Sequence, residues 1–355
     1  MPMLPLVADP ASYRPCIQDL LRDGDRIRDY WLTLFERHLD TLAALPQADR
    51  RFEHHAAWPR FAAAYLAGLA DLRRRPDLRG ILTVLELTRY RDEMLAEFGF
   101  FDPFLDLKRR ENRIAVDQYA SVVRELDAMD PGSRDESLAR GLFAGNLFDM
   151  GSKAAVDAFE RGGGDFAAAR SRVRPRPWAV DDFESWSRRR RYRQCLFFVD
   201  NCGPDIVLGV IPFVRELARG GTRIVLAANS KPALNDITAV ELVELLDELR
   251  PLDPTLDRLV SKAHGESESA CISVVASGCT SPLIDLSDVL PACCAAANES
   301  DLLVLEGMGR AIESNYDTRF SVDTLKVALI KDPMVAETIG VSLFDPVFRF
   351  EPVPS

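Results

Sequence analysis

The stretch CLFFVDNCGPDIVLGVIPFVREL, residues 195–217, decides the fold, because it joins a buried strand to a helix. Its apolar run stops at Asp200 and Asn201, turns through Gly203 and Pro204, and resumes with helical spacing. A carboxylate and an amide are costly to bury unless a partner compensates them. This strand ending therefore supplies the first candidate site residues.

Five more apolar runs follow, and helical stretches alternate with them. They read as strands at residues 222–228, 271–276, 301–306, 326–331 and 346–351. Alternating strands and helices indicate βαβ units and a mostly parallel sheet covered on both faces.

Before about residue 170 the pattern differs, because apolar residues there recur at spacings of three and four. A join rich in Gly, Pro and Arg, at residues 161–193, separates the two patterns. We therefore expect an α/β protein with a helical N-terminal domain, residues 1–170, packed on a three-layer α/β/α Rossmann-like domain, residues 171–355.

Composition limits the partners and the compartment. The formal net charge is -11 and the pI is about 5.0, which disfavours binding to nucleic acid or an anionic membrane. No apolar run is long enough to span a bilayer, and the first residues do not resemble a secretory signal. Seven cysteines without a CxxC pair favour reduced thiols. We expect a cytoplasmic protein, and self-association into a homodimer is compatible with the sequence.

Six strands are predicted, and each of the first five ends in polar residues. Ligands of parallel α/β sheets bind beyond the carboxyl ends of the strands, so we expect these residues to form one site. They are Asp200-Asn201, Asn229-Ser230, Ser277-Gly278, Glu306-Gly307 and Lys331-Asp332.

The residue types suit a metal ion and a phosphate. Asp200, Asn201 and Asp236 offer oxygen donors, which fit Mg²⁺, Mn²⁺ or a similar octahedral ion better than zinc. Such an ion polarises a phosphoryl group, and Lys331 provides a positive charge for a phosphate. Asn229 precedes a turn that could direct backbone N–H groups at an anion. Asp236 has an alternative role as N-cap of a helix over residues 237–249.

Two further groups have open interpretations. Glu306 begins EGMGR, where glycines allow close backbone approach and Arg310 can reach a phosphate or a carboxylate. Asn146 and Asp149 share one face of a helix and either reach the site or link the two domains. The arginine run 188–191 is interpreted as a solvated surface.

Several enzyme classes lack their motifs here. No Walker loop or GxGxxG follows a strand, which disfavours nucleotide hydrolysis and dinucleotide binding. A GxSxG elbow is absent, and the four histidines lie away from the strand ends, which disfavours a Ser-His-Asp hydrolase.

Together VDN, NSKPALND and EGMGR resemble the motifs of the metal-dependent damage-control phosphatases, a family formerly known as a domain of unknown function. The EGMGR motif is similar to the branch that includes the phosphatase domain of a bifunctional pantothenate kinase paralogue. The resemblance runs from about residue 95 to the C-terminus. Without a kinase-sized segment in the sequence, we expect a stand-alone phosphatase.

This resemblance implies a function and a set of roles. Asp200, Asn201 and Asp236 would hold a divalent ion (Mn²⁺, Co²⁺, Ni²⁺ or Mg²⁺), with Asp200, Asp236 and Lys331 as catalytic residues. The substrate pocket would be formed by Asn229, Ser230, Glu306, Gly307, Arg310, Asn146 and Asp149. The implied substrate is 4′-phosphopantetheine or its oxidised or damaged forms, whose removal would limit coenzyme A synthesis.

Two departures and two alternatives accompany this hypothesis. Cys202 stands where a small hydroxyl residue is expected, and Lys231 stands where a glycine is expected. The thiol would lie beside the metal, and the lysine would add charge near the pocket. The alternatives are a sugar-phosphate phosphatase of a sister branch and an inactive metabolite-binding protein of the same fold. EGMGR disfavours the first, and the intact metal residues disfavour the second.

Overall fold

The computed structural model describes residues 1–47, 50–147, 166–189, 191–260 and 271–353. Its first part is helical, as the spacing of apolar residues predicts. The elements before the sheet are α1 (Asp25–Ala44), β1 (Pro46–Gln47), β2 (Arg50–Arg51), η1 (Phe52–His54), α2 (Trp58–Arg74), α3 (Val84–Glu97), α4 (Leu105–Ala128), α5 (Pro131–Leu147) and α7 (Phe166–Arg172).

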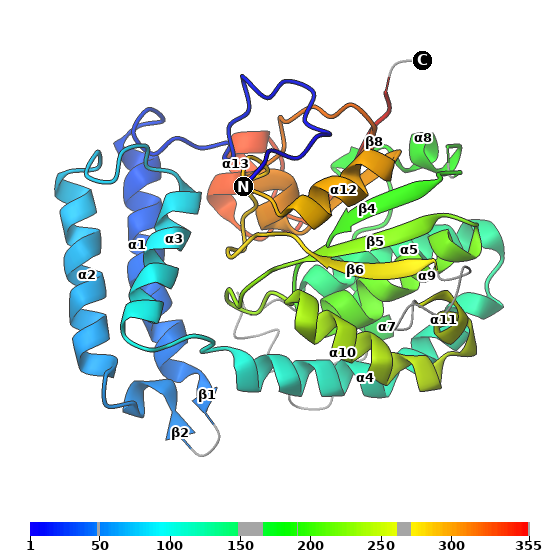
Figure 1. The fold of residues 1–355 in the computed structure, drawn as a ribbon, viewed down its shortest axis with the longest axis horizontal. Coiled ribbons are helices and arrows are strands. Elements are labelled where there is room, and N and C mark those ends of the chain that lie inside the picture. Colours follow the sequence, from blue (N-terminus) through cyan, green and yellow to red (C-terminus); the bar gives the residue numbers. More distant parts are fainter. Residues whose placement is uncertain (48–49, 148–165, 190, 261–270, 354–355) are drawn as a thin grey trace.

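A seven-stranded sheet forms the centre of the molecule (Figure 1). Its strands are β3 (Val180–Asp181), β4 (Gln194–Phe198), β5 (Arg223–Ala228), β6 (Ile272–Ala276), β7 (Leu302–Glu306), β8 (Asp323–Leu329) and β9 (Pro346–Glu351). They lie in the order β3-β9-β8-β7-β4-β5-β6. All neighbours are parallel except β8 and β9.

The elements that alternate with these strands complete the fold. They are α8 (Phe183–Ser187), η3 (Asp205–Val210), α9 (Ile211–Arg219), α10 (Ala239–Leu249), η4 (Arg250–Leu252), α11 (Pro254–Leu259), α12 (Pro291–Glu299), η5 (Met308–Glu313) and α13 (Pro333–Ile339).

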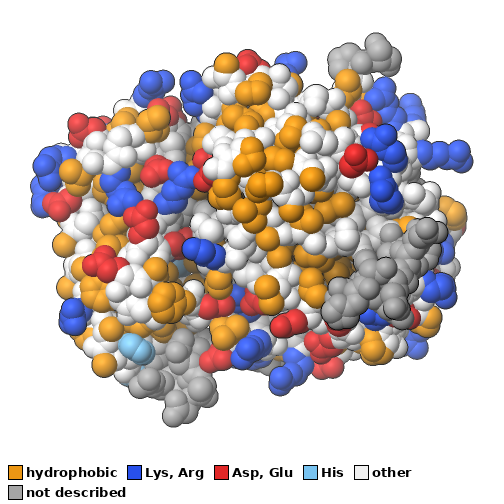
Figure 2. Space-filling model, viewed as in Figure 1, with side chains coloured by type: hydrophobic (Ala, Val, Ile, Leu, Met, Phe, Trp, Pro, Cys, Tyr) orange, Lys and Arg blue, Asp and Glu red, His pale blue; other side chains and the backbone are white. Residues whose placement is uncertain are grey.

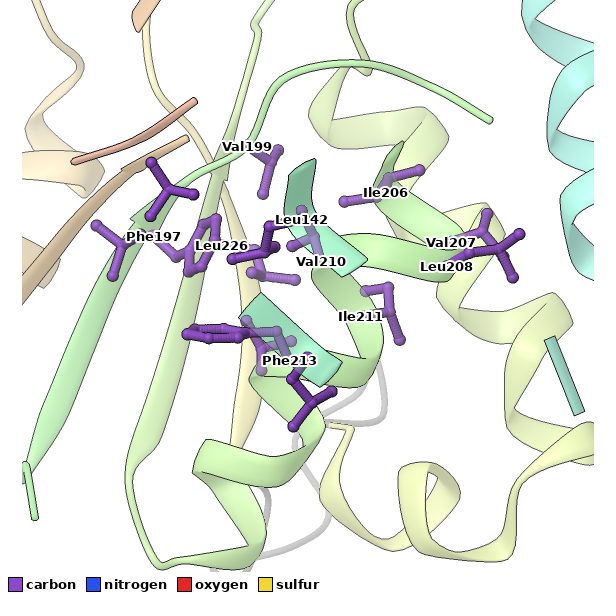
Figure 3. Packing of buried hydrophobic residues seen from close by; sticks show 14 of the residues in the cluster. Leu142, Phe197, Val199, Ile206, Val207, Leu208, Val210, Ile211, Phe213 and Leu226 are labelled. Carbon is purple, nitrogen blue, oxygen red and sulfur yellow. The ribbon is translucent and has the colours of Figure 1, made fainter. Parts of the chain in front are cut away.

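Helices cover both faces of the sheet, because successive side chains of a strand point to opposite faces. Phe197 of β4 packs in a core with α4, α5, α9 and α10, whereas its neighbours Leu196 and Phe198 pack with α1–α3, α12 and α13. In Figure 3, Phe197 and Leu226 project from their strands toward Leu142 and Phe213. The three-layer α/β/α prediction is confirmed.

Helices from the first 170 residues pack on both faces. α4 and α5 share the core of one face, and α1–α3 share the core of the other. The division into domains at residue 170 stays a prediction.

The strand predictions from the apolar runs are confirmed for β4 to β9. The helical spacing of apolar residues begins at about residue 16, but α1 begins only at Asp25. Residues 16–24 are irregular, with turns, bends and an isolated bridge at Asp19. Of the predicted helix that contains Asn146 and Asp149, the structure describes the part up to Leu147, the last residue of α5, and Asp149 lies outside the described residues.

Two details of the helices could not be read from spacing. The residues after β4 and β7 form π-helical turns, η3 and η5, instead of ordinary helix. Such turns are rare in proteins overall, and those that occur often lie at functional sites. The N-cap of α10 is Thr238, whose Oγ1 accepts from the backbone N–H of Glu241 in a capping box, so the N-cap role considered for Asp236 is wrong.

The surface visible in Figure 2 carries charged side chains of both signs. On the face shown in Figure 2, acidic and basic side chains of the described residues are interspersed rather than segregated into a basic surface. Within the described ranges, no helix has the length and hydrophobicity needed to cross a membrane.

Candidate metal and phosphate site

The candidate site lies where the strand order changes direction. From β4 the chain proceeds outward to β5 and β6, then returns to β7 on the other side of β4. Crevices of this kind are the usual ligand sites of open α/β sheets. Asp200 follows β4 and Glu306 ends β7, and the backbone N–H of Asp200 donates to Oε2 of Glu306 at 3.1 Å.

Gly307 makes this juxtaposition possible. Its φ is 92°, a conformation that residues with a Cβ rarely adopt, and a Cβ there would overlap the Asp200 carboxylate. The first glycine of EGMGR therefore allows the end of β7 to approach Asp200.

The two carboxylate oxygens of Asp200 face different partners. Its Oδ1 accepts from the Arg310 guanidinium, and its Oδ2 accepts from Nδ2 of Asn201 at 2.9 Å. The same guanidinium donates to Oδ2 of Asp236 at 2.8 Å and to Oδ1 of Asn229 at 3.0 Å. Asn229 in turn donates from Nδ2 to Asp236 at 2.8 Å. Asp200 and Asp236 thus converge on one cationic group.

A second pair of carboxylates lies behind Asp200 and Asn201. Oδ2 of Asp205 accepts from the Asn201 side chain at 3.0 Å and from its backbone N–H at 3.3 Å. Asn146 of α5 donates from Nδ2 to Asp205 at 3.2 Å and to Glu306 at 3.1 Å. Helix α5 comes this close because Gly145 has no side chain: a Cβ there would lie 2.7 Å from Cα of Asp205.

The site holds more negative than positive charge. Asp200, Asp205, Asp236 and Glu306 are all at most 6% exposed, and Arg310 is the buried cation that contacts two of them. Burial, with repulsion from Asp205 and Asp200, raises the pKa of Glu306 well above its usual value. A proton or a bound cation must compensate this charge.

Among the described residues, the geometry brings together one group of carboxylates that can hold a metal ion. Asp200, Asp205 and Glu306 each offer an oxygen, and the three oxygens lie within 4.8 Å of one another. This group shares only Asp200 with the set predicted from the sequence, Asp200, Asn201 and Asp236. Both sets are hard oxygen donors that fit Mg²⁺ or Mn²⁺.

A cavity of about 400 Å³ opens onto the site. Its polar end contains Asp200, Asn201, Asp236, Glu313, Lys331 and Asp332. The N-terminal helices and Phe104 contribute both apolar and polar side chains to the lining. The apolar ones are Trp31, Leu34, Phe35, Val84 and Phe104, and the polar ones are Arg37, His38, Thr41, Thr88 and Arg91. The N-terminal helices therefore line the cavity together with the strand ends.

The remaining predicted residues take different positions. Lys331 is half-buried and lines the cavity. Ser230 is exposed, and its Oγ accepts from the backbone N–H of Gly278 at 2.8 Å. The backbone N–H groups of Asn229 and Ser230 donate to backbone carbonyls, so they do not point at an anion. Asp149 lies outside the described residues.

Cys202 and Lys231, the two residues that depart from the family pattern, differ in their burial. Cys202 is buried, and burial raises the pKa of its thiol well above the usual value, which disfavours a thiolate. Lys231 is exposed and is not among the residues that line the cavity.

Sequence reasoning missed Asp205 and Glu313. Asp205 follows Asp200 by five residues, at the start of the element after the strand, and this proximity was the available signal. Glu313 follows Arg310 by three residues and lines the cavity. The sequence feature that could have identified Glu313 was its position one helical turn after the arginine.

Comparison with known proteins decides the family. The family model "Damage-control phosphatase ARMT1-like domain" matches residues 27–347. The chain belongs to this family. The family hypothesis from VDN, NSKPALND and EGMGR is confirmed.

Relatives of this damage-control phosphatase are similar over almost its whole length. Damage-control phosphatase At2g17340 of Arabidopsis thaliana is 38% identical, over 90% of this chain and 85% of the relative. Pantothenate kinase 2 of the same plant is 38% identical over 99% of this chain and 42% of the relative. The 4′-phosphopantetheine phosphatase of Mus musculus is 35% identical over 98% of this chain and 48% of the relative. The chain thus spans about half the length of these last two proteins.

The fold is shared with a solved structure. A DUF89 family protein from Pyrococcus horikoshii superimposes with a TM-score of 0.64 at 16% identity, covering 90% of this chain and 96% of the other. At this identity the likeness concerns the fold.

Proposed function

We propose that the protein is a metal-dependent phosphatase that hydrolyses a small phosphomonoester, 4′-phosphopantetheine or its oxidised or damaged forms. One observation carries this proposal: four buried carboxylates and one arginine meet at the strand ends, beside a cavity of about 400 Å³. Membership of the damage-control phosphatase family supports the reaction type.

For the metal we propose the ligands Asp200, Asn201 and Asp236. All three line the cavity, so an ion held by them is within reach of a substrate, whereas Asp205 and Glu306 are not among the lining residues. Asp205 then acts by holding the Asn201 amide, and Glu306 by holding the backbone of Asp200. A bound divalent cation polarises a phosphoryl group and lowers the pKa of water.

The protein's own cations serve the phosphate. Lys331 lines the cavity just beyond the end of β8. Arg310 is not among the lining residues, but it is held by two that are, Asp200 and Asp236, and by Asn229. Fixed positive groups in a water-poor site stabilise the charge that develops on a transferring phosphoryl group. The N-terminal helices contribute by limiting the access of bulk water.

The cavity also supports the proposed substrate class. The lining combines apolar side chains, such as Trp31 and Phe35, with polar ones, such as Thr88 and Arg91, which suits a substrate whose non-phosphate part is long and partly apolar, such as a pantetheine arm. The name of the mouse relative points the same way. The cytoplasmic location and the homodimer stay predictions; all seven cysteines are free, which agrees with a reducing compartment.

A phosphate-release screen tests the proposal. It compares 4′-phosphopantetheine, its S-sulfonate and a set of sugar phosphates, each with Mg²⁺, Mn²⁺, Co²⁺ and Ni²⁺. We expect metal-dependent release that is fastest with the pantetheine compounds. Faster release from the sugar phosphates would favour the sister-branch function, and no release from any ester would favour a binding protein.

A further inference from the structure

Glu313 is a buried carboxyl group in the cavity that the proposed metal and phosphate contacts leave unused. It ends the π-helical turn η5, three residues after Arg310, and only 7% of its surface is exposed. It lines the cavity together with Asp200 and Lys331. Its side chain makes no hydrogen bond or ion pair with the described residues, unlike the neighbouring Asp332, which caps α13 through two backbone N–H groups.

The surroundings of Glu313 favour its protonated form. The acidic groups around it are Asp332 beyond β8 and Asp200 beyond β4, and Lys331 is the nearby cation. Tyr30 of α1 and Cys16 of the N-terminal segment face it from the helical side. Burial, with repulsion from Asp332, raises the pKa of Glu313 to about 8. At neutral pH this carboxyl group therefore carries a proton that it can donate.

A phosphatase acting on an alkyl ester needs such a group. When the ester P–O bond breaks, the leaving alcohol departs as a strongly basic alkoxide unless a proton reaches its oxygen. A positioned acid whose pKa lies near the working pH supplies that proton efficiently. Arg310 is held by the carboxylates of Asp200 and Asp236 and does not give up its proton, so it is a poor candidate for this role.

We propose that Glu313 is the general acid that protonates the leaving oxygen of the substrate. The inference rests on the proposed phosphatase function. Water forms the new P–O bond, the electron pair of the old P–O bond goes to the ester oxygen, and that oxygen takes the proton of Glu313. Of the two protons of water, one remains on the phosphate and one returns to the Glu313 carboxylate, so the cycle closes without another reactant.

The test compares two esters whose leaving groups differ in their need for a proton. Glu313→Gln keeps the size of the side chain but cannot donate the proton. We expect kcat for 4′-phosphopantetheine, an alkyl ester, to fall by about 100-fold, the usual contribution of general acid catalysis. With p-nitrophenyl phosphate, whose leaving group needs no proton, we expect a change of less than about threefold. Glu337→Gln, at an exposed glutamate of α13, is the matched control and should leave both rates unchanged.

A second readout does not depend on activity. At about pH 7, the infrared difference between wild type and Glu313→Gln should show the stretch of a protonated carboxyl group that the variant lacks. Equal losses for both esters, no loss for either ester, or an ionised Glu313 at that pH would each overturn the inference. A wild-type protein that hydrolyses neither ester would instead overturn the proposed function, and the inference with it.

Discussion

The backbone N–H of Asp200 donates to Oε2 of Glu306 at 3.1 Å, across the two central strands where the sheet changes direction. This bond joins the two motifs that mark the family, VDN and EGMGR, into one structural unit. The Asp200 carboxylate also contacts Arg310, so the first and the last residue of EGMGR both contact Asp200.

Gly307→Ala should disrupt the site more than an ordinary substitution of glycine. A Cβ at this position must displace the Asp200 carboxylate, so we expect kcat/KM to fall by at least about 100-fold. Gly340→Ala is the control, because Gly340 also has a positive φ, 74°, but no atom near its Cβ position. It should cost about 1–2 kcal/mol of stability from backbone strain and keep its activity. Equal activity of the two variants would contradict the role given to Gly307.

Asp236→Asn and Asp205→Asn distinguish the two metal sets. If Asp236 is a ligand, its variant should weaken metal binding by well over 100-fold, whereas Asp205→Asn, acting through Asn201, should weaken it by about 10–100-fold. Calorimetric titration with Mn²⁺ measures both. A larger loss in Asp205→Asn would assign the ion to Asp200, Asp205 and Glu306 instead.

Asn146→Asp should show how strongly the site repels another negative charge. The variant loses an amide that donates to Asp205 and Glu306 and adds a carboxylate beside them. We expect the free energy of unfolding in the absence of metal to fall by about 3–5 kcal/mol. Asn146→Leu removes the same donor without the charge and should cost less. If the two variants are equally stable, the excess of negative charge does not govern this region.

Lys326 makes stability depend on pH in a defined direction. It is fully buried in β8 and donates to the backbone carbonyls of Tyr316 and Thr318. Burial outweighs the attraction of Glu351 and lowers its pKa from 10.5 to about 8. Between these values the unfolded chain holds a proton that the folded chain has released, so the free energy of unfolding rises with pH.

Urea unfolding of wild type and Lys326→Met between about pH 7 and pH 10.5 measures this effect. The stability of wild type relative to the variant should increase by up to about 3 kcal/mol across that range. Lys231→Met, at an exposed lysine, controls for the loss of one charge. If the free energy of unfolding of wild type relative to Lys326→Met stays constant or decreases with pH, the lowered pKa of Lys326 is contradicted.

Much of the fold and part of the site follow from the sequence. Apolar runs ending in polar residues locate strands and their exits, so Asp200, Asn229, Glu306 and Lys331 were predicted at the correct edge of the sheet. Asp205 was missed because its role depends on the π-helical turn that brings it back under Asn201, and periodicity does not distinguish that turn from an α-helix. The contribution of the N-terminal helices to the cavity depends on tertiary packing, which spacing alone does not reveal.

The contacts of Arg310 show a second limit to what the sequence predicts. The sequence predicts that this arginine reaches a phosphate or a carboxylate, but the choice depends on which acids the strands bring together. In the structure it contacts Asp200 and Asp236, seventy-four or more residues away along the chain. Such long-range charge pairing has no local signature.

The central claim, that Asp200 anchors metal-dependent phosphatase chemistry, is tested most directly by phosphate release from 4′-phosphopantetheine. The measurement compares wild type with Asp200→Asn, each with Mn²⁺ and with chelator, after thermal unfolding has shown that both are folded. We predict that wild type releases phosphate only with the metal and that Asp200→Asn releases none above background under either condition. A folded Asp200→Asn protein that retains metal-dependent release would contradict the account.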